Sequence, residues 1–461
     1  MLRVRPSLLV LILTVLVATP VVPQSVVQEY DSLSVKLFKH ALASGKAYET
    51  LRELTTTVGH RISGSPQAAH AVEWAERVMK ESGLENVHRE PCMVPRWVRG
   101  KPEQAAIILP GGRRIPVKIL ALGGSIGTPA NGITAEVIEV QSLKEAASLG
   151  ARAKGKIIFY NRPFDRTKFD TFEGYGGAVD QRVGGAVAAA SVGGVLSLVR
   201  SITPSLDDVP HTGGMWYRDS IPKIPGVAIS TLGAEQLSGL LKKNPHLKVF
   251  VKTSCKTLPD VESFNVVGEI PGSEKPGDVI VMGGHLDSWD VGQGAHDDGA
   301  GVVQSIEAAR LLMTLGLKPR RTIRVVAFMN EENGTRGGRA YAAKDRPGEA
   351  PIAAIESDRG GFMPRGFTTD ADSVRFATMK SWEPLFRPIM ADRIMHGEGG
   401  ADISFLQRRG AVQIGLYPEP ARYFSYHHTN EDTFDKVDER ELELGAACMA
   451  ILSYVIAQQG L

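Results

Sequence analysis

Acidic and histidine side chains follow one apolar segment after another in the second half of the 461-residue chain. These side chains are His285, Asp287, Asp297, Asp298, Glu331, Glu332, Asp358, His427 and His428. Imidazoles and carboxylates without thiolates are typical ligands of zinc and, less specifically, of manganese, cobalt or iron(II). Because the set is larger than one tetrahedral ion uses, two metal ions are the natural count.

Each group of these residues also has an interpretation without a metal. Asp297 and Asp298 suit the start of a helix, where acidic side chains cap free N–H groups and meet the positive end of the helix dipole. Asp358 precedes Arg359 and could form a surface ion pair, while the paired glutamates and paired histidines could lie in solvated loops. Since every group falls where a strand gives way to a loop or a helix, their joint occurrence favours a metal site.

The elements that must position these side chains begin at about residue 262, where strand-like and helix-like segments alternate. The strands are predicted from VVGEI, DVIVMGG, RTIRVVAFM, IAAIES and AVQIGLY, and a long helix from about 439 to 458 is expected to close one face of the sheet. Alternation of this kind predicts an α/β fold with a mixed, largely parallel sheet sandwiched by helices. Ligand sites in such sheets lie beyond the carboxyl ends of the strands.

The earlier part of the chain has a different texture. Ser65 and Pro66 predict the N-cap and first residue of an amphipathic helix that stops before Gly83. Short strand-like runs separated by Gly and Pro turns then predict an inserted β-rich module, and its stretch GGAVAAASVGGVLSLV predicts a buried helix and strand rather than a membrane span. The expected organisation is a signal sequence (1–24), an N-terminal part of the catalytic domain whose start is a candidate propeptide (25–104), the insert (105–260) and the main catalytic domain (261–461).

The N-terminus is typical of a secretory signal sequence. Arg3 and Arg5 precede an apolar run from Leu8 to Ala18, which is about half of the roughly 20 residues that a membrane-spanning helix needs. Export is therefore expected, to an extracellular, lysosomal or bacterial-envelope destination, without a stable membrane anchor.

Composition excludes several other classes of protein. With 43% hydrophobic and 23% charged residues the chain is globular rather than disordered. A net charge of +2 without long basic runs argues against nucleic acid as a partner. The three widely spaced cysteines, Cys92, Cys255 and Cys448, cannot form a disulfide framework. A GxSxG motif is absent, which disfavours a serine hydrolase.

Four segments in a fixed order carry a family resemblance: GGHLDSWDVGQGAHDDGAG, AFMNEENGTRGGRAY, ESDRGG and HHTNEDT. They resemble the M28 family of di-zinc metallopeptidases, and the likeness extends over nearly the whole chain. The resemblance implies that Asp297 bridges two zinc ions. It further implies that His285 and Asp358 complete one zinc site and that Glu332 and His428 complete the other.

The same resemblance implies roles for neighbouring residues. Glu331 is expected to be the general base, and Asp287 to orient and polarise His285. Asp298 is expected to shape the backbone after the bridging acid without binding metal. His296, directly before the bridging acid, is expected to face away from the metals.

Two further features depend on the resemblance. The family's ligand histidine stands immediately before a threonine, which selects His428 over His427. The segment HGEGGADISF resembles the family's Gly-rich loop near the substrate, so His396 and Asp402 are candidates for substrate binding, although Asp402 could equally cap the helix ISFLQRRG. Residues 105–260 resemble the protease-associated insert of the family, which is expected to rim the cleft.

The expected function is that of an exported di-zinc exopeptidase acting on short peptides, foremost dipeptides with a free N-terminus. Metal-activated water would attack the peptide bond, with Glu331 as general base. A single-zinc acyltransferase of the glutaminyl-cyclase type and a non-catalytic receptor-like ectodomain are the alternatives, and the full two-metal ligand set argues against both. The family also suggests a homodimer.

Overall fold

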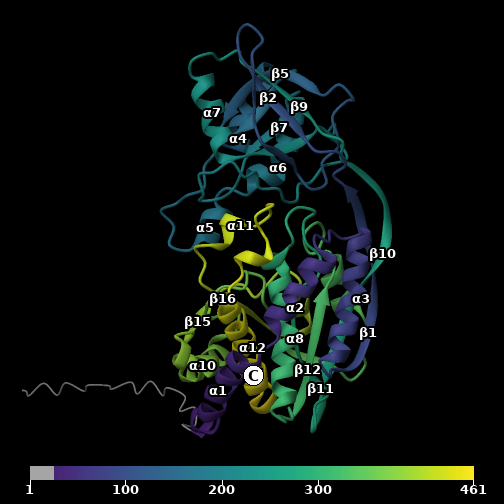
Figure 1. Ribbon diagram of the computed structural model, residues 1–461, viewed down its shortest axis with the longest axis vertical. Helices are drawn as coiled ribbons and strands as arrows, with labels where there is room; N and C mark the ends of the chain where they lie inside the picture. The colour runs from purple at the N-terminus through teal and green to yellow at the C-terminus, as the bar shows by residue number, and fades with distance from the viewer. Residues whose placement is uncertain (1–24) are drawn as a thin grey trace, which may run out of the picture.

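The computed structural model describes residues 25–461 and contains two eight-stranded sheets, one in a lower unit and one in an upper unit (Figure 1). The predicted signal sequence, residues 1–24, lies outside the described residues. The lower sheet has the strand order β1 (Glu85–Val98), β10 (Lys256–Ile270), β12 (Arg321–Phe328), β11 (Lys275–His285), β13 (Ala350–Glu356), β16 (Val412–Pro418), β14 (Pro364–Thr369), β15 (Arg393–His396).

The centre of the lower sheet is parallel and its margins are mixed. Strands β12, β11, β13 and β16 pair in parallel, whereas β1 and β10 run antiparallel at one side and β14 runs antiparallel to β16 at the other. Helices cover both faces, so the predicted α/β class with a mixed sheet between helices is confirmed. The helices of this unit are α1 (Ser25–Ser44), α2 (Ala47–Glu53), α3 (Pro66–Glu81), α8 (Ala300–Thr314), α9 (Arg336–Ala343), α10 (Ser373–Ser381), α11 (Tyr423–Tyr426) and α12 (Glu439–Gln459).

Alternating residues of the central strands build the core on both faces of this sheet. Ile280 and Met282 of β11 pack toward α8 and α12, whereas Val279 and Val281 pack toward α9 and the short helix η5 (Ile403–Arg409). A strand with both faces covered must be apolar throughout, which explains why β12 is buried at every position. The burial of these strands fixes the edge at which their carboxyl ends emerge.

Two predicted helices have the ends that the sequence indicates. The side chain of Ser65 accepts a hydrogen bond from the N–H of Ala68, Pro66 is the first residue of α3, and Gly83 follows the helix with a φ of +89°. Helix α12 is the one helix within residues 25–461 that is long and apolar enough to cross a membrane, but 94% of its apolar window is buried inside the lower unit. It serves here as the central core helix.

The upper unit contains the second sheet, with the strand order β3 (Arg114–Pro116), β2 (Gln104–Ile108), β9 (Lys248–Lys252), β5 (Ile133–Val140), β6 (Ile157–Tyr160), β7 (Leu196–Arg200), β8 (Gly226–Ile229), β4 (Ile119–Ala121). Its helices are α4 (Leu143–Ser148), α5 (Thr171–Gly176), α6 (Asp180–Ser191) and α7 (Thr231–Leu241). The Gly/Ala-rich stretch forms buried α6 followed by β7, as predicted.

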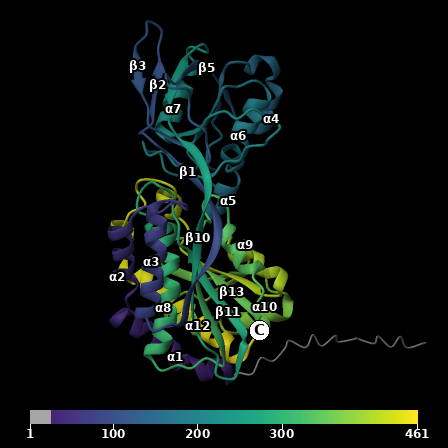
Figure 2. The same ribbon diagram turned by 90° about the vertical axis from the view of Figure 1, so that its right-hand side faces the viewer.

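The two units are joined by the long strands β1 and β10, which pair antiparallel from the lower sheet upward into the connection with the upper unit (Figure 2). They also meet where α5 lies beside α11 (Figure 1). There the ring of Phe172 stacks on Tyr423 at 5.5 Å between centroids, and Tyr175 stacks on Phe424 at 4.6 Å. The upper unit therefore packs directly on the segment that leads to His427 and His428.

Candidate metal centre

The acidic and histidine side chains meet at the carboxyl edge of the lower sheet. His285 is the last residue of β11, Glu331 and Glu332 follow β12, and Asp358 follows β13. Asp297 lies in the short turn η3 (Ala295–Gly299) before α8. His427 and His428 follow α11, which comes after β16.

Asp297 stands at the centre of this cluster, between two histidines. Its Oδ1 lies 3.1 Å from Nε2 of His285, and that same nitrogen lies 3.5 Å from Oδ1 of Asp358. Its Oδ2 lies 3.3 Å from Nε2 of His428, which in turn lies 3.1 Å from Oε2 of Glu332. The two oxygens of one carboxylate thus face two separate groups of ligand atoms.

The electrostatics of the cluster fit a cation-binding role. Burial raises the pKa of Glu332, and the neighbouring charge of Asp297 raises it further. Burial likewise raises the pKa of Asp358. Oδ2 of Asp297 is buried and accepts no hydrogen bond. Carboxylates clustered this closely repel one another unless cations bind between them. The nitrogen and oxygen ligand atoms of the cluster suit zinc.

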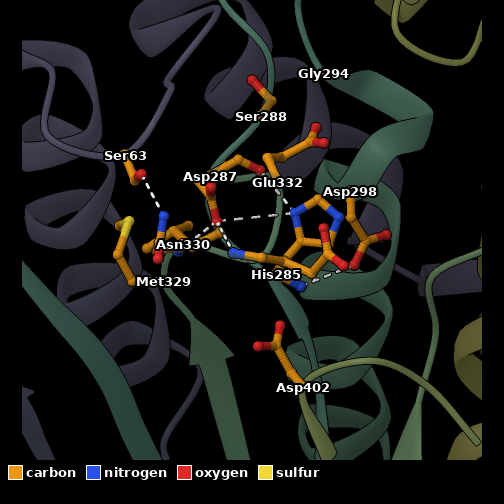
Figure 3. Close-up of polar contacts among 12 residues, drawn as sticks. Ser63, His285, Asp287, Ser288, Gly294, Asp298, Met329, Asn330, Glu332 and Asp402 are labelled. Carbon is orange, nitrogen blue, oxygen red and sulfur yellow. Dashed lines mark hydrogen bonds and ion pairs between the residues drawn. The ribbon is translucent and has the colours of Figure 1, made fainter. Parts of the chain in front are cut away.

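Asp298 and Asp287 hold backbone rather than facing the cluster (Figure 3). Asp298 accepts hydrogen bonds from the N–H of His285 at 3.0 Å and of Gly301 at 2.9 Å, and so ties the end of β11 to the start of α8. Oδ1 of Asp287 accepts from the N–H groups of Asn330 at 2.6 Å and Glu331 at 3.0 Å. These bonds fix the turn on which both glutamates stand.

The backbone carbonyl of Asp287 orients His285, whereas the sequence predicts that role for the Asp287 carboxylate. Nδ1 of His285 donates to the backbone carbonyl of Asp287 at 2.9 Å, whereas the Asp287 carboxylate is 4.0 Å away. The carboxylate acts on the histidine ring mainly as a nearby charge, because its hydrogen bonds go to the backbone after β12. A carbonyl partner on Nδ1 leaves Nε2 free to face Asp297 and Asp358.

The histidine pair is held by the upper unit. The N–H of Thr212 donates to the carbonyl of His428 at 3.0 Å, and the carbonyl of Thr212 accepts from Nδ1 of His428 at 3.3 Å. Nδ1 of His211 donates to the carbonyl of His427 at 2.8 Å. His428 has a φ of +62°, which a non-glycine residue adopts only where its surroundings impose it. Both rings lie near Asp297, but only His428 also contacts Glu332.

His296 faces away from the cluster, as expected. Its Nδ1 accepts from the N–H of Gly361 at 3.2 Å, and its Nε2 lies 3.3 Å from the carbonyl of Lys436. Its ring stacks on Phe362 at 4.1 Å between centroids. Both ring nitrogens are therefore engaged with backbone.

The structure does not bring His396 to the metal centre. Its ring is exposed at the end of the edge strand β15 and stacks on Phe376 at 3.8 Å between centroids. Asp402 is buried and points toward the cluster (Figure 3), but neither of its carboxylate oxygens has a hydrogen-bond partner. It therefore does not cap η5. The carboxylate of Glu356 takes that place by accepting from the N–H of Ile403 at 2.9 Å.

Three residues that support the centre are not predicted from the sequence. Glu356 stands at the end of a predicted strand, and the N–H groups that donate to its carboxylate belong to Asp402 and Ile403, far along the chain. Asp432, within HHTNEDT, accepts from the N–H groups of His296 at 2.7 Å and Asp297 at 3.1 Å. Its presence in that motif was an available signal. Arg61 has no such signal.

Arg61 is fully buried and clamps the loop between β11 and η3. Its guanidinium donates to the carbonyls of Leu286 at 2.6 Å, Gln293 at 2.8 Å and Gly294 at 2.9 Å, and to that of Gly59 at 3.2 Å. The loop carries the chain from His285 to Asp297. Arg61 thus fixes how the two ends of the cluster approach each other.

A cavity of about 380 Å³ opens onto the cluster. Its lower wall includes Asp297, Glu331 and Glu332, and its upper wall includes aromatic residues of the upper unit, among them Tyr175 and Trp216. Burial, above all, raises the pKa of Glu331 to about 8, and nearby carboxylates contribute. A half-buried acid at a cavity wall, with an elevated proton affinity, is suited to accepting and releasing protons.

Comparison with known proteins adds independent evidence. The model of peptidase family M28 matches residues 265–452. Carboxypeptidase Q of Bos taurus is 40% identical over 92% of this chain and 88% of its own length, and carboxypeptidase Q of Homo sapiens is 39% identical with the same coverage. The crystal structure of a peptidase M28 precursor from Shewanella amazonensis has a TM-score of 0.90 at 33% identity, covering 94% of this chain and 98% of that one. A zinc aminopeptidase from Bacillus subtilis shares the fold, with a TM-score of 0.66 at 20% identity, covering 90% and 95%.

Proposed function

The chain belongs to peptidase family M28, as its motifs predicted, and is a metallo-exopeptidase; we propose that it uses two zinc ions to hydrolyse short peptides, foremost dipeptides, that have a free amino terminus. One observation carries the proposal. Asp297 presents one oxygen to His285 and the other to His428. A carboxylate in that position suits a bridge between two cations.

The residues that would hold the metals divide into two groups around this bridge. His285 and Asp358 would hold one zinc ion, and Glu332 and His428 the other. When bound, zinc supplies Lewis acidity toward water and toward the scissile carbonyl. The backbone N–H of Trp289 donates to Oε1 of Glu332 at 3.1 Å, which leaves Oε2 of Glu332 directed at His428.

Glu331 is proposed as the general base. It lines the cavity beside Asp297, while its own N–H is anchored on Asp287. From this position its carboxylate takes a proton from the attacking water, holds it, and passes it to the departing amine. The adjacent side chains of Glu331 and Glu332 can play different roles because they leave the turn in different directions.

The acidic lower wall of the cavity supports recognition of a free amino terminus. Glu331, Glu332, Asp297 and Asp358 all face the cavity, so a protonated amine finds opposite charge there. The aromatic upper wall faces this acidic wall across the cavity, and the narrow space between them favours short substrates over folded proteins. This wall supports the proposal that the upper unit is a protease-associated insert that limits access to the cavity.

Hydrolysis of a matched substrate pair tests the proposal. The zinc-loaded protein is incubated with alanyl-leucine and with N-acetyl-alanyl-leucine, alongside Glu331→Gln and a control variant, Glu439→Gln, at the exposed start of α12. Only the unblocked dipeptide is expected to be cleaved, and Glu331→Gln is expected to lose at least about 100-fold in kcat. Equal cleavage of the acetylated peptide would overturn the free-amine requirement, and an active Glu331→Gln would overturn the base assignment.

We also propose that the protein is exported, on the strength of the signal-like segment 1–24. The intact mass of protein recovered from outside the producing cells is expected to lack about that many residues. Recovery of the full-length chain inside the cells alone would contradict export.

A further inference from the structure

Arg182 on α6 is a buried arginine without an acidic partner. It is 8% exposed, and no carboxylate in residues 25–461 forms an ion pair with it. Its Nη2 donates to the phenol of Tyr175 at 2.6 Å, its Nη1 reaches the carbonyl of Thr212 only at 3.4 Å, and its Nε is buried without any hydrogen-bond partner.

The other buried arginines are well satisfied. Arg200, Arg321 and Arg324 pair with Glu235, Asp278 and Glu269 respectively. Arg61 donates to four backbone carbonyls. A buried guanidinium whose N–H groups lack hydrogen-bond acceptors lowers the stability of the fold. An apolar side chain would fill the same space with a smaller loss of stability. The unsatisfied Arg182 therefore needs another explanation.

The position of Arg182 supplies one. It lines the cavity that opens onto the metal centre, and it lies there with Glu331 and His428. The carbonyl of Thr212 is shared between Nη1 of Arg182 and Nδ1 of His428, so a single peptide group separates the arginine from the proposed zinc ligand. The guanidinium of Arg182 also lies against Gly213, which has a φ of +131°. A Cβ at position 213 would clash with this guanidinium.

The cavity is thus polarised. Its lower wall is acidic, whereas Arg182 from the upper unit brings a positive charge to another wall. A dipeptide is a zwitterion with a positive amine and a negative carboxylate only two residues apart, which matches the scale of a cavity of about 380 Å³.

We propose that the guanidinium of Arg182 binds the C-terminal carboxylate of the substrate, so that the enzyme selects dipeptides with a free carboxyl terminus. The inference rests on the proposed peptidase activity and deepens it. Each additional residue would move the carboxylate by about 3.5 Å along an extended chain, away from Arg182. The fork geometry of arginine, rather than its charge alone, provides the selection.

Three substrates that differ only in where a carboxylate stands test this inference. Alanyl-leucine has a C-terminal carboxylate, alanyl-leucinamide has none, and the α-amide of alanyl-glutamic acid has one on the side chain alone. In the unmodified enzyme, kcat/KM for alanyl-leucine is expected to exceed that for either amide by about 100-fold, the size of a paired, charge-assisted contact. In Arg182→Gln that ratio is expected to fall close to one, and Arg182→Lys is expected to retain part of it.

The matched control is Arg200→Gln, which removes a buried arginine of the same unit that lies outside this cavity. It is expected to lower the melting temperature while leaving the acid-to-amide ratio unchanged. A second readout is free of turnover: calorimetric binding of alanyl-leucine and alanyl-leucinamide to Glu331→Gln, with and without Arg182→Gln. Only the acid is expected to lose affinity when the arginine is removed.

Several outcomes would overturn the inference. An unmodified enzyme that cleaves acid and amide equally well refutes it while leaving the proposed function intact. A ratio that survives in Arg182→Gln refutes it as well, and preference for the glutamate α-amide assigns Arg182 to a side chain instead. If the unmodified enzyme cleaves none of the three, the proposed function fails, and the binding measurement alone decides on Arg182.

Discussion

Glu90 on β1 offers a quantitative test of how the lower unit is stabilised. The residue is 4% exposed, and its carboxylate accepts hydrogen bonds from Arg346 at 2.6 and 2.7 Å and from Lys344 at 2.9 Å, beyond the end of α9. His88 lies 3.2 Å from it. Burial alone raises the pKa of Glu90, but the hydrogen bonds from His88, Lys344 and Arg346 outweigh burial and lower it from 4.5 to about 2.

The sign and size of the effect follow from proton linkage. The unfolded chain takes up the proton first as the pH falls, so the stabilisation is complete well above pH 4.5 and is lost as the pH falls toward 2. One pKa unit corresponds to about 1.4 kcal/mol. Because Lys344 and His88 are half-exposed and solvent screens them, we expect about 2–3 kcal/mol at pH 7.

Urea unfolding of the unmodified protein and of Glu90→Gln, repeated from pH 7 to pH 3.5, measures this contribution. The variant is expected to unfold about 2–3 kcal/mol more easily at pH 7, and the difference is expected to shrink by roughly half by pH 3.5. The control Glu81→Gln removes an exposed ion pair with Arg77 and should change stability by less than about 0.5 kcal/mol. A difference for Glu90→Gln that is independent of pH would refute the reasoning.

Three further perturbations test the support of the metal centre. Arg61→Lys is expected to lower the free energy of unfolding by about 2–4 kcal/mol, measured by urea unfolding, because one ammonium group cannot reach four carbonyls; an unchanged value would contradict the clamp. Gly301→Ala is expected to cost more than about 2 kcal/mol, since its Cβ would clash with the carbonyl of Ser357, whereas Gly239→Ala, with open space around it, is the control. Removal of metal with a chelator is expected to lower the melting temperature, because the carboxylates around Asp297 then repel one another, and zinc is expected to restore it; insensitivity to the chelator would argue against a metal centre.

Much of the lower unit could be predicted from the sequence because its signals are local. The apolar runs of β11 and β12 mark buried strands, and the Ser65–Pro66 pair marks the start of α3. Residues at strand ends could be assigned to one edge because the topology of an α/β sheet requires it. These rules are enough to bring together His285, Asp297 and their neighbours.

What the sequence could not predict depends on contacts between distant segments. Glu356 caps η5 only because the loop before residue 403 returns to the end of β13. Arg61 precedes three of its four acceptors by more than two hundred positions. Arg182 reaches the centre only through the packing of the upper unit. The motif HGEGGADISF points to His396, but the strand that carries His396 lies at the sheet edge, where the ring stacks on Phe376. Besides the predicted α6, the β-rich segment contains α4, α5 and α7, which its short strand-like runs do not indicate.

Metal stoichiometry is the decisive measurement for the centre built around Asp297. The purified protein is loaded with zinc, freed of excess metal and analysed for zinc per folded chain, together with His285→Ala and His428→Ala. Two zinc ions per chain are expected in the unmodified protein and about one in each variant, because each histidine belongs to a different group of ligands. One ion or none in the unmodified protein, with the fold intact, would contradict a two-metal centre.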